Sequence, residues 1–382
     1  MSERISLLDL TQPQLVKLMA SWSQPRYRAE QVRGWIYEKL ASDAAQMTNL
    51  PGVLRDRLGA EISLNPLELV HEQRSRDGQT VKWLFQLQDG QTIETVLMLY
   101  ADGAGLARLE ATTGPDSGES MTPMPDAVTE RRTVCISSQA GCGMGCVFCA
   151  TGQAGLARNL TSAEIVAQVL AAARWLVSPN AEAGAASGRL TNVVLMGMGE
   201  PMANYERVWQ ALRTLTSKDG LNLGARHITL STVGLPPGIL RMAEEPLQIN
   251  LAVSLHAPND LLRTQLVPIN HRYPLREVMA AVRQYIDRTH RRVTFEYALM
   301  QGINDSTALA GELATVLRGL ICHVNLIPLN PVVESPYQPS TAQAAGAFKA
   351  VLERRGIPCT MRMRRGIDID AGCGQLRRRL SQ

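Results

Sequence analysis

The decisive stretch of this sequence is Gly141-Cys142-Gly143-Met144-Gly145-Cys146-Val147-Phe148-Cys149-Ala150. Three cysteines spaced C-x3-C-x2-C can ligate three irons of a [4Fe–4S] cluster, because cysteine thiolates are the usual ligands of such clusters. The fourth iron would then lack a protein ligand, and an open metal position is typical of a reactive site. Spacing alone leaves a second interpretation open, a tetrahedral zinc site with Cys135 as its fourth ligand.

Strands and helices alternate on the C-terminal side of this stretch. The predicted strands are 133–138, 191–198, 226–232, 250–255, 293–300 and 324–329, and the predicted helices between them include 161–176, 205–215, 275–289 and 307–317. Six βα units predict a parallel sheet flanked by helices. Right-handed crossovers make a partial barrel one architecture for them. An open doubly wound sheet is the other, and the pattern does not distinguish the two.

Residues 1–62 have the pattern of a small helical module. Thr11 and Gln14 form the signature of a capping box at the start of its first helix. A second helix follows Pro25, and its outer face carries Arg26, Arg28 and Arg33. Such a face either contacts nucleic-acid phosphates or is simply solvated.

Residues 63–132 differ in character. Asp77-Gly78 and Asp89-Gly90 separate segments of alternating polarity, which is a strong signal for β-hairpins. Residues 101–130 are rich in Gly, Pro, Ser, Thr and Asp and are predicted to be a loop insertion. Residues 133–382 then hold the alternating units and the C-terminal segment.

Composition narrows the class of protein. The net charge is +4, and residues 349–382 carry nine Lys or Arg against three Asp or Glu, so the basic charge is concentrated at the C-terminal end. Such a concentration of basic residues is typical of an RNA-binding surface, and also of an ordinary solvated surface.

Cysteine usage indicates the compartment. Seven cysteines, three of them clustered, argue against a disulfide framework, and Cys322 and Cys359 are expected in the core. No apolar segment follows Met1 and no run is long enough to span a bilayer, so we expect a cytoplasmic protein.

Polar residues follow the predicted strands where active sites of parallel α/β folds gather. Such side chains can hold ribose hydroxyls, an amino-acid head group or an adenine edge. The residues concerned are Gly199 and Glu200 after the second strand, Ser231 in the third, Ser254, Leu255 and His256 at the fourth, and Asn330 after the sixth.

Taken together, the motifs resemble the RlmN family of dual-specificity RNA methyltransferases, which are radical S-adenosylmethionine enzymes. The motifs are Cys-Ile-Ser-Ser-Gln-Ala-Gly-Cys, Met-Gly-Met-Gly-Glu-Pro, Ser-Leu-His-Ala-Pro-Asn, Leu-Ile-Pro-Leu-Asn-Pro and Asp-Ile-Asp-Ala-Gly-Cys-Gly-Gln. The likeness runs from about residue 8 to the C-terminal end. It implies an α/β fold, a partial (β/α)6 radical-SAM barrel over 133–382, with an RNA-binding helical module over 1–62 and a small β-hairpin extension over 63–132.

The resemblance also implies roles for single residues. It implies that Cys142, Cys146 and Cys149 ligate a [4Fe–4S] cluster. It implies that Cys373 is the cysteine that becomes methylated, that Cys135 later forms a disulfide with it, and that Glu94 accepts a proton. By pattern alone Glu94 is an exposed strand carboxylate. The positions that match S-adenosylmethionine contacts are Gly199, Glu200, Ser231, Ser254, Leu255, His256 and Asn330.

The implied reaction is methylation of carbon 2 of one adenine in 23S ribosomal RNA and in transfer RNA, through a methylated cysteine, a methylene radical and a resolving disulfide. Cfr-type enzymes methylate carbon 8 of the same adenine, and Pro201 after Gly-Glu favours carbon 2. An electron donor of the flavodoxin or ferredoxin type is implied, and the chain is expected to be a monomer. Two rival classes are a radical enzyme acting on a small molecule and a non-catalytic metal-containing RNA-binding protein.

Overall fold

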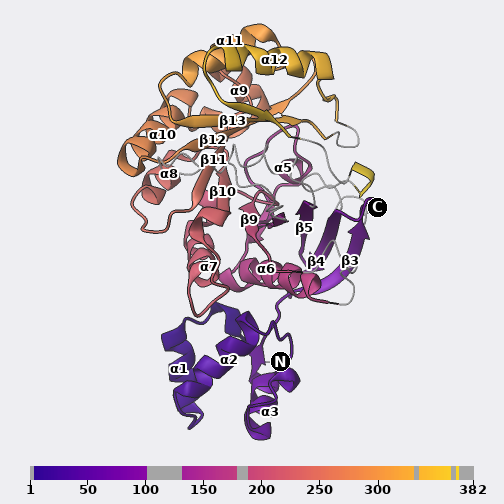
Figure 1. Ribbon diagram of the computed structural model, residues 1–382, viewed down its shortest axis with the longest axis vertical. Helices are drawn as coiled ribbons and strands as arrows, with labels where there is room; N and C mark the ends of the chain where they lie inside the picture. Colours follow the sequence, from indigo (N-terminus) through magenta and orange to yellow (C-terminus); the bar gives the residue numbers. More distant parts are fainter. Residues whose placement is uncertain (1–3, 101–130, 179–187, 331–334, 363–366, 370–382) are drawn as a thin grey trace, which may run out of the picture.

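The computed structural model describes residues 4–100, 131–178, 188–330, 335–362 and 367–369 of the 382-residue chain. Its helices and strands form a three-helix N-terminal lobe below a large mixed sheet with helices along its outer side (Figure 1). The predicted insertion at 101–130 and Cys373 lie outside the described residues.

The N-terminal lobe is helical, as the sequence pattern predicts. Its helices are α1 (Gln12–Ser21), α2 (Tyr27–Tyr37) and α3 (Gly52–Glu61). The capping box at α1 is confirmed, since Gln14 Oε1 accepts from the backbone N–H of Thr11 at 2.8 Å. Strand β1 (Ile5–Ser6) pairs in parallel with β2 (Ile62–Ser63) and brings the two ends of the lobe together.

Arg33 does not lie on an outer face of α2, and that prediction was wrong. Its side chain is buried, Nε donates to the carbonyl of Asp219 at 3.0 Å, and the guanidinium lies over the ring of Tyr37. The reason is that α2 is covered on a second side by the barrel, which a single-helix pattern does not reveal. Arg26 is exposed, as expected of a solvated face.

The sheet has ten strands in the spatial order β14-β13-β12-β11-β10-β9-β6-β5-β4-β3. The six predicted parallel strands are all present: β6 (Arg131–Cys135), β9 (Asn192–Leu195), β10 (Ile228–Thr232), β11 (Asn250–Ser254), β12 (Val293–Leu299) and β13 (Cys322–Pro328). Their spatial order follows their chain order without reversal, which is the winding of a partial barrel and not of a doubly wound sheet. A seventh parallel strand, β14 (Cys359–Met361), was not predicted.

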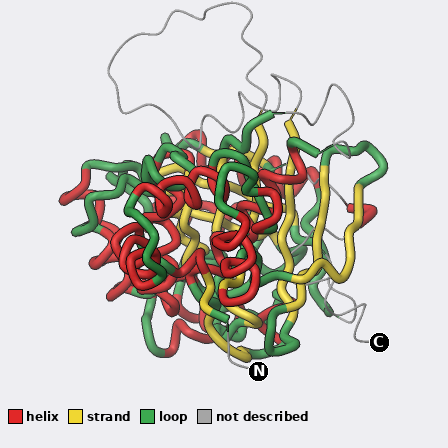
Figure 2. Tube along the Cα trace, turned by 90° about the horizontal axis from the view of Figure 1, so that it is seen from below, coloured by secondary structure: helices red, strands yellow, loops and turns green. Residues whose placement is uncertain are grey.

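Helices follow these strands and cover the outer side of the sheet, and the strands of the hairpin extension form one edge of the same sheet (Figures 1 and 2). The four predicted helices are confirmed as α6 (Ser162–Leu176), α7 (Tyr205–Thr216), α10 (Leu275–Thr289) and α11 (Thr307–Val316). Within the described part of the barrel, the other α-helices are α5 (Ala150–Gln153), α8 (Pro236–Met242), α9 (Asp260–Leu266) and α12 (Ala342–Arg354).

The hairpin extension continues the barrel sheet. It consists of β3 (Glu68–Arg74), β4 (Thr80–Gln86) and β5 (Thr92–Tyr100), all paired antiparallel, and β5 pairs antiparallel with β6. The two Asp-Gly turns are present, with Gly78 and Gly90 at positive φ. One uninterrupted sheet therefore links the extension to the strand that precedes the cysteine stretch.

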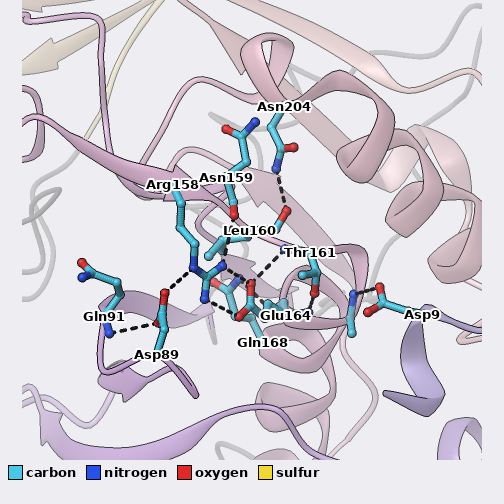
Figure 3. Close-up of polar contacts among 11 residues, drawn as sticks. Asp9, Asp89, Gln91, Arg158, Asn159, Leu160, Thr161, Glu164, Gln168 and Asn204 are labelled. Atoms are coloured by element: carbon cyan, nitrogen blue, oxygen red, sulfur yellow. Dashed lines mark hydrogen bonds and ion pairs between the residues drawn. The ribbon is translucent and has the colours of Figure 1, made fainter. Parts of the chain in front are cut away.

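Three parts of the chain meet at the N-terminus of α6 (Figure 3). Arg158, in strand β8 (Leu156–Asn159) after the cysteine stretch, donates from Nη1 and Nη2 to the two carboxylate oxygens of Glu164 at 2.8 Å each. Its Nε donates to Asp89 in the β4–β5 turn at 2.5 Å. Asp9 of the N-terminal lobe accepts from the backbone N–H of Ala163 at 2.8 Å. This junction fixes the lobe and the extension relative to the barrel.

Candidate active site

A pocket opens at the carboxyl ends of the parallel strands, where the sequence predicts it. Its volume is ≈ 320 Å³, and its walls come from the cysteine stretch, the barrel strands and the hairpin extension. Ten of the predicted site residues line it: Cys135, Cys142, Cys146, Cys149, Gly199, Glu200, Ser231, Ser254, His256 and Asn330.

Backbone contacts hold the cysteine stretch in place. Strand β7 (Gln139–Gly141) pairs with β8, so both ends of the stretch are anchored. Gly141 has φ +82°, and a Cβ there would come within 2.1 Å of the carbonyl oxygen of Gly155, so only glycine fits. The N–H of Cys142 donates to that carbonyl at 2.8 Å, and the N–H of Cys149 donates to the carbonyl of Cys146 at 3.1 Å.

The three thiols suit a cation-containing ligand. Burial raises the pKa of Cys142 to about 11, and burial followed by the neighbouring thiols of Cys149 and Cys142 raises the pKa of Cys146 further. Ionised sulfurs crowded in this way need positive charge beside them, which an iron–sulfur cluster supplies. Cys135 is on β6, outside the stretch. Among the described residues no three or more His, Cys, Asp or Glu form a group that could hold a single metal ion.

One buried cation that the sequence reasoning missed lies close to the thiols. Arg263 in α9 is fully buried, and its charge opposes the rise in the pKa of Cys146. Its guanidinium donates to the carbonyls of Leu255 and Val233 and to Asn270 Oδ1. Arg263 thereby joins the ends of two barrel strands behind the cysteine stretch.

Gly199 and Glu200 form a second wall. Gly199 has φ +103°, and a Cβ would come within 2.5 Å of the Gln139 side chain. The carboxylate of Glu200 accepts from the N–H of Met202 at 3.0 Å and from the N–H of Val233 at 2.8 Å. Burial still raises the pKa of Glu200 to about 7. A buried carboxylate of this kind favours a cationic partner, such as the ammonium group of an amino acid.

His256 has a strained backbone at the pocket wall, with φ +62°. Asn304 supports this conformation by donating to the His256 carbonyl at 2.9 Å. The backbone N–H of Ala298 donates to Nδ1 at 3.0 Å, and burial lowers the imidazole pKa to about 3. The ring is therefore neutral and carries its proton on Nε2, where it can donate. Phe148 packs edge-on against it, with ring centroids 4.9 Å apart.

Ser231 and Ser254 end adjacent strands, and their hydroxyl oxygens are 3.3 Å apart. Asn330 is exposed where the chain leaves β13. Leu255 differs from the other predicted contacts because its side chain is buried in the hydrophobic core and does not line the pocket. Cys322 and Cys359 are buried in β13 and β14, as predicted.

Glu94 is not an exposed carboxylate, so the interpretation from its pattern was wrong. Its side chain is only 4% exposed, and Oε1 lies 3.6 Å from Nζ of Lys82, which is fully buried. The cause is that β5 is an interior strand between β4 and β6. The Ser137 hydroxyl donates to the Glu94 carbonyl at 2.7 Å, which fixes the backbone at this point. Glu94 shares its face of the sheet with Val96, a pocket-lining residue.

The sequence reasoning also missed two charged residues of the pocket wall, Glu296 and Arg362. Glu296 in β12 is buried, accepts from Asn325 Nδ2 at 2.8 Å, and has its pKa raised to about 7 by burial. The signal for Glu296, as for Lys82, was a charged residue inside an otherwise apolar strand.

Comparison with known proteins agrees with this geometry. Residues 136–310 match the Radical SAM superfamily, and residues 5–64 match the ribosomal RNA large subunit methyltransferase N-terminal domain. A protein of Chloroflexus aurantiacus named "Probable dual-specificity RNA methyltransferase RlmN" is 48% identical over 380 residues, covering 98% of this chain and 93% of that protein.

The chain belongs to the RlmN family of radical SAM RNA methyltransferases. A relative of the same name from Roseiflexus sp. is 44% identical and covers 97% of this chain and 96% of that protein. The crystal structure of a radical SAM methyltransferase from Sphaerobacter thermophilus is 50% identical, with a TM-score of 0.85 over 97% of this chain and 98% of that one. The resemblance stated from the motifs and the partial-barrel fold are thus confirmed.

RlmN-family membership implies an iron–sulfur cluster and S-adenosylmethionine, and the pocket fits both. Three thiols converge on it from one anchored stretch, and Glu200, the serine hydroxyls and the Nε2–H of His256 offer polar partners nearby. Within the described part of the chain, no helix has both the length and the apolar character needed to cross a membrane.

Proposed function

We propose that this enzyme methylates carbon 2 of a specific adenine in 23S ribosomal RNA and in transfer RNA. The observation that carries the proposal is the placement of Cys135 and Glu94 on one face of the sheet, beside the pocket lined by the three clustered cysteines. The relatives' name supports the RNA substrate, and the match at residues 5–64 supports ribosomal RNA.

Cys142, Cys146 and Cys149 would hold the cluster, and Glu200, Ser231, Ser254, His256 and Asn330 would hold S-adenosylmethionine. When bound, these groups supply one-electron chemistry, which an adenine ring carbon requires because it is not a nucleophile. The role of the chain's own residues is to orient the sulfonium against the cluster and to exclude water. The neutral His256 ring and the apolar Phe148 beside it suit that role.

Three further residues would complete the reaction. Cys373 would carry the methyl group to the adenine, as the family resemblance implies. Glu94 would then accept the ring proton. The thiolate of Cys135 would attack the sulfur of Cys373, so that a disulfide forms while the carbon–sulfur bond breaks. Its electron pair would pass to the carbon, which would take up a proton and remain on the base as the methyl group. The segment that leads to Cys373 supports this arrangement, because Arg362 lines the pocket and Asp368 accepts from the N–H of Arg76 in the extension at 2.8 Å.

RNA binding would involve the basic residues of 349–382 and the N-terminal lobe. The target base must leave its stack to reach a pocket at the strand ends. The RNA substrates and the free cysteines among the described residues suit the reducing cytoplasm. The electron donor would be a protein of the flavodoxin or ferredoxin type. The enzyme would act as a monomer.

The test is an anaerobic reaction of the reconstituted enzyme with reductant, S-adenosylmethionine and unmodified 23S ribosomal RNA fragments or transfer RNA, followed by nucleoside mass spectrometry. 2-Methyladenosine is the expected product. 8-Methyladenosine would instead make the enzyme Cfr-type, and 5′-deoxyadenosine without a methylated base would show that RNA is not its substrate.

A further inference from the structure

Lys82 is a fully buried cation beside the two groups that would finish the reaction. It lies on β4, its Nζ is 3.6 Å from Oε1 of Glu94, and both side chains are shielded from water. We propose that Lys82 is a shared positioning residue that couples proton acceptance by Glu94 to attack by Cys135. This inference rests on the proposed function of the pocket.

The strand register places these groups side by side. Lys82 is the cross-strand partner of Val96, and Val96 is the partner of Cys135, so the three residues form one row across β4, β5 and β6. Glu94 is two residues from Val96 on the same strand and therefore on the same face. Neighbouring strands lie about 4.8 Å apart, so Lys82 and Cys135 are about 10 Å apart between their Cα atoms, with Glu94 close to both.

Fold stability does not explain a lysine at this position. A fully buried ammonium is costly unless it is paired, and a buried ion pair can usually be replaced by apolar residues without loss of stability. Leu84, the next residue of β4 on the same face as Lys82, is buried and apolar, which shows that an apolar side chain can be held on this face. The Lys82–Glu94 pair is therefore better explained by chemistry than by packing.

The charges around Cys135 explain how the coupling works. Burial raises the pKa of Cys135 to about 11; the charges of Arg362 and Lys82 oppose that rise, and the carboxylate of Glu94 adds to it. When Glu94 takes up the proton from the adenine, its negative charge disappears and no longer offsets the effect of the Lys82 charge on Cys135. The thiolate of Cys135 becomes easier to form at that moment, so proton acceptance precedes and promotes the attack on Cys373.

The coupling can be measured without cluster, cofactor or RNA. We would alkylate the full-length apoprotein with iodoacetamide across pH 7–10 and follow Cys135 by peptide mass spectrometry. Glu94→Gln imitates the protonated carboxyl and should speed Cys135 alkylation by about threefold or more, because half a pKa unit changes the thiolate fraction about threefold. Lys82→Met should slow it by a similar factor, and Lys82→Arg should resemble the wild type.

Lys218→Met, at an exposed lysine far along the chain from this row, is the matched control and should leave Cys135 unchanged. An unaltered or slower rate in Glu94→Gln would overturn the proposal. If Lys82→Met does not fold, Glu94→Gln and Lys82→Arg still decide the question, and Lys82→Met/Glu94→Gln removes both charges so that neither is left unpaired.

Turnover gives a second readout. In the methylation assay Lys82→Met should lower kcat by about tenfold or more, while KM for RNA and formation of 5′-deoxyadenosine stay near the wild-type values. The double variant should react more slowly at Cys135 than Glu94→Gln does, because it lacks the lysine charge that favours the thiolate. A double variant that reacts as fast as Glu94→Gln would contradict the action of Lys82 on Cys135. A wild type that forms no methylated adenine would defeat the proposed function, whereas the alkylation series would still report on Lys82.

Discussion

Two buried carboxyls give the pocket an unusual chemistry at the residue scale. Burial raises the pKa of both Glu200 and Glu296 to about 7, although backbone or amide donors contact each of them. Near neutral pH each group is therefore divided between its acid and its carboxylate. A positively charged ligand group would shift Glu200 to the carboxylate. Binding of that group should therefore release the proton that the neutral acid carries.

The raised pKa of Glu296 predicts how stability changes with pH. A carboxyl whose pKa is higher in the folded than in the unfolded protein contributes its full stability below about pH 4.5 and loses it as pH rises through about 7. A shift of this size corresponds to about 3 kcal/mol. Relative to wild type, Glu296→Gln apoprotein should therefore gain about 3 kcal/mol in unfolding free energy between pH 4.5 and pH 8.

Urea denaturation at several pH values measures this difference. Glu244→Gln is the control, because Glu244 is 61% exposed in a surface pair with Arg288. A wild type and Glu296→Gln that keep the same stability difference at every pH would show that Glu296 is not destabilised by its burial.

Short motifs marked the predicted residues that line the pocket. The clustered cysteines, Gly199 and His256 were identified because short segments carry them directly after strands. Glu94 and Lys82 could not be placed, because whether a strand is at an edge or in the interior depends on partners distant in the sequence. Nothing in the local pattern showed that β5 would be covered on both sides.

At the scale of elements, the junction at the N-terminus of α6 joins the N-terminal lobe and the hairpin extension to the barrel (Figure 3). Arg158 is held by Glu164 and Asp89, and its side chain is 31% exposed. Arg158→Gln leaves Glu164, which is 7% exposed, without its cation. We expect a loss of about 1–3 kcal/mol in unfolding free energy, as for charge-assisted hydrogen bonds, and faster amide exchange in the β4–β5 turn.

Arg288→Gln is the matched control, since its ion pair with Glu244 is exposed and should contribute at most about 0.5 kcal/mol. Equal losses in the two variants, by chemical denaturation, would mean that the junction does not depend on Arg158.

Element-level prediction was accurate for long periodic segments and failed for short or distant ones. Hydrophobic spacing identified six parallel strands and four barrel helices. Strand β14 has only three residues, too few to show alternation. The hairpins were recognised from their Asp-Gly turns, but their continuity with the barrel sheet depends on pairing between β5 and β6 across residues 101–130.

At the scale of the whole molecule, the N-terminal lobe projects from the barrel below α6 and α7 (Figure 1). Arg26 is exposed on it, and Arg28 is partly exposed next to Gln31. If this face contacts RNA phosphates, Arg26→Gln/Arg28→Gln should weaken RNA binding and reduce the slope of log K against log salt by about 1–2.

The measurement is RNA affinity by filter binding at several salt concentrations, together with S-adenosylmethionine affinity, which should not change. Arg288→Gln on the barrel surface serves again as the comparison. A salt slope identical to the wild type would mean that this face of α2 is merely solvated.

The order of strands in the sheet bears on how the enzyme is made. The ten strands of the main sheet lie in chain order, from β3 at one edge to β14 at the other, and among the described strands between these two only the β7–β8 pair lies outside it. A growing chain can therefore add strands one at a time to a sheet that already exists. The pocket, however, takes Val96 from the first part of the chain and Arg362 from the last. A nascent chain on the ribosome therefore lacks a complete reaction chamber until synthesis is nearly finished.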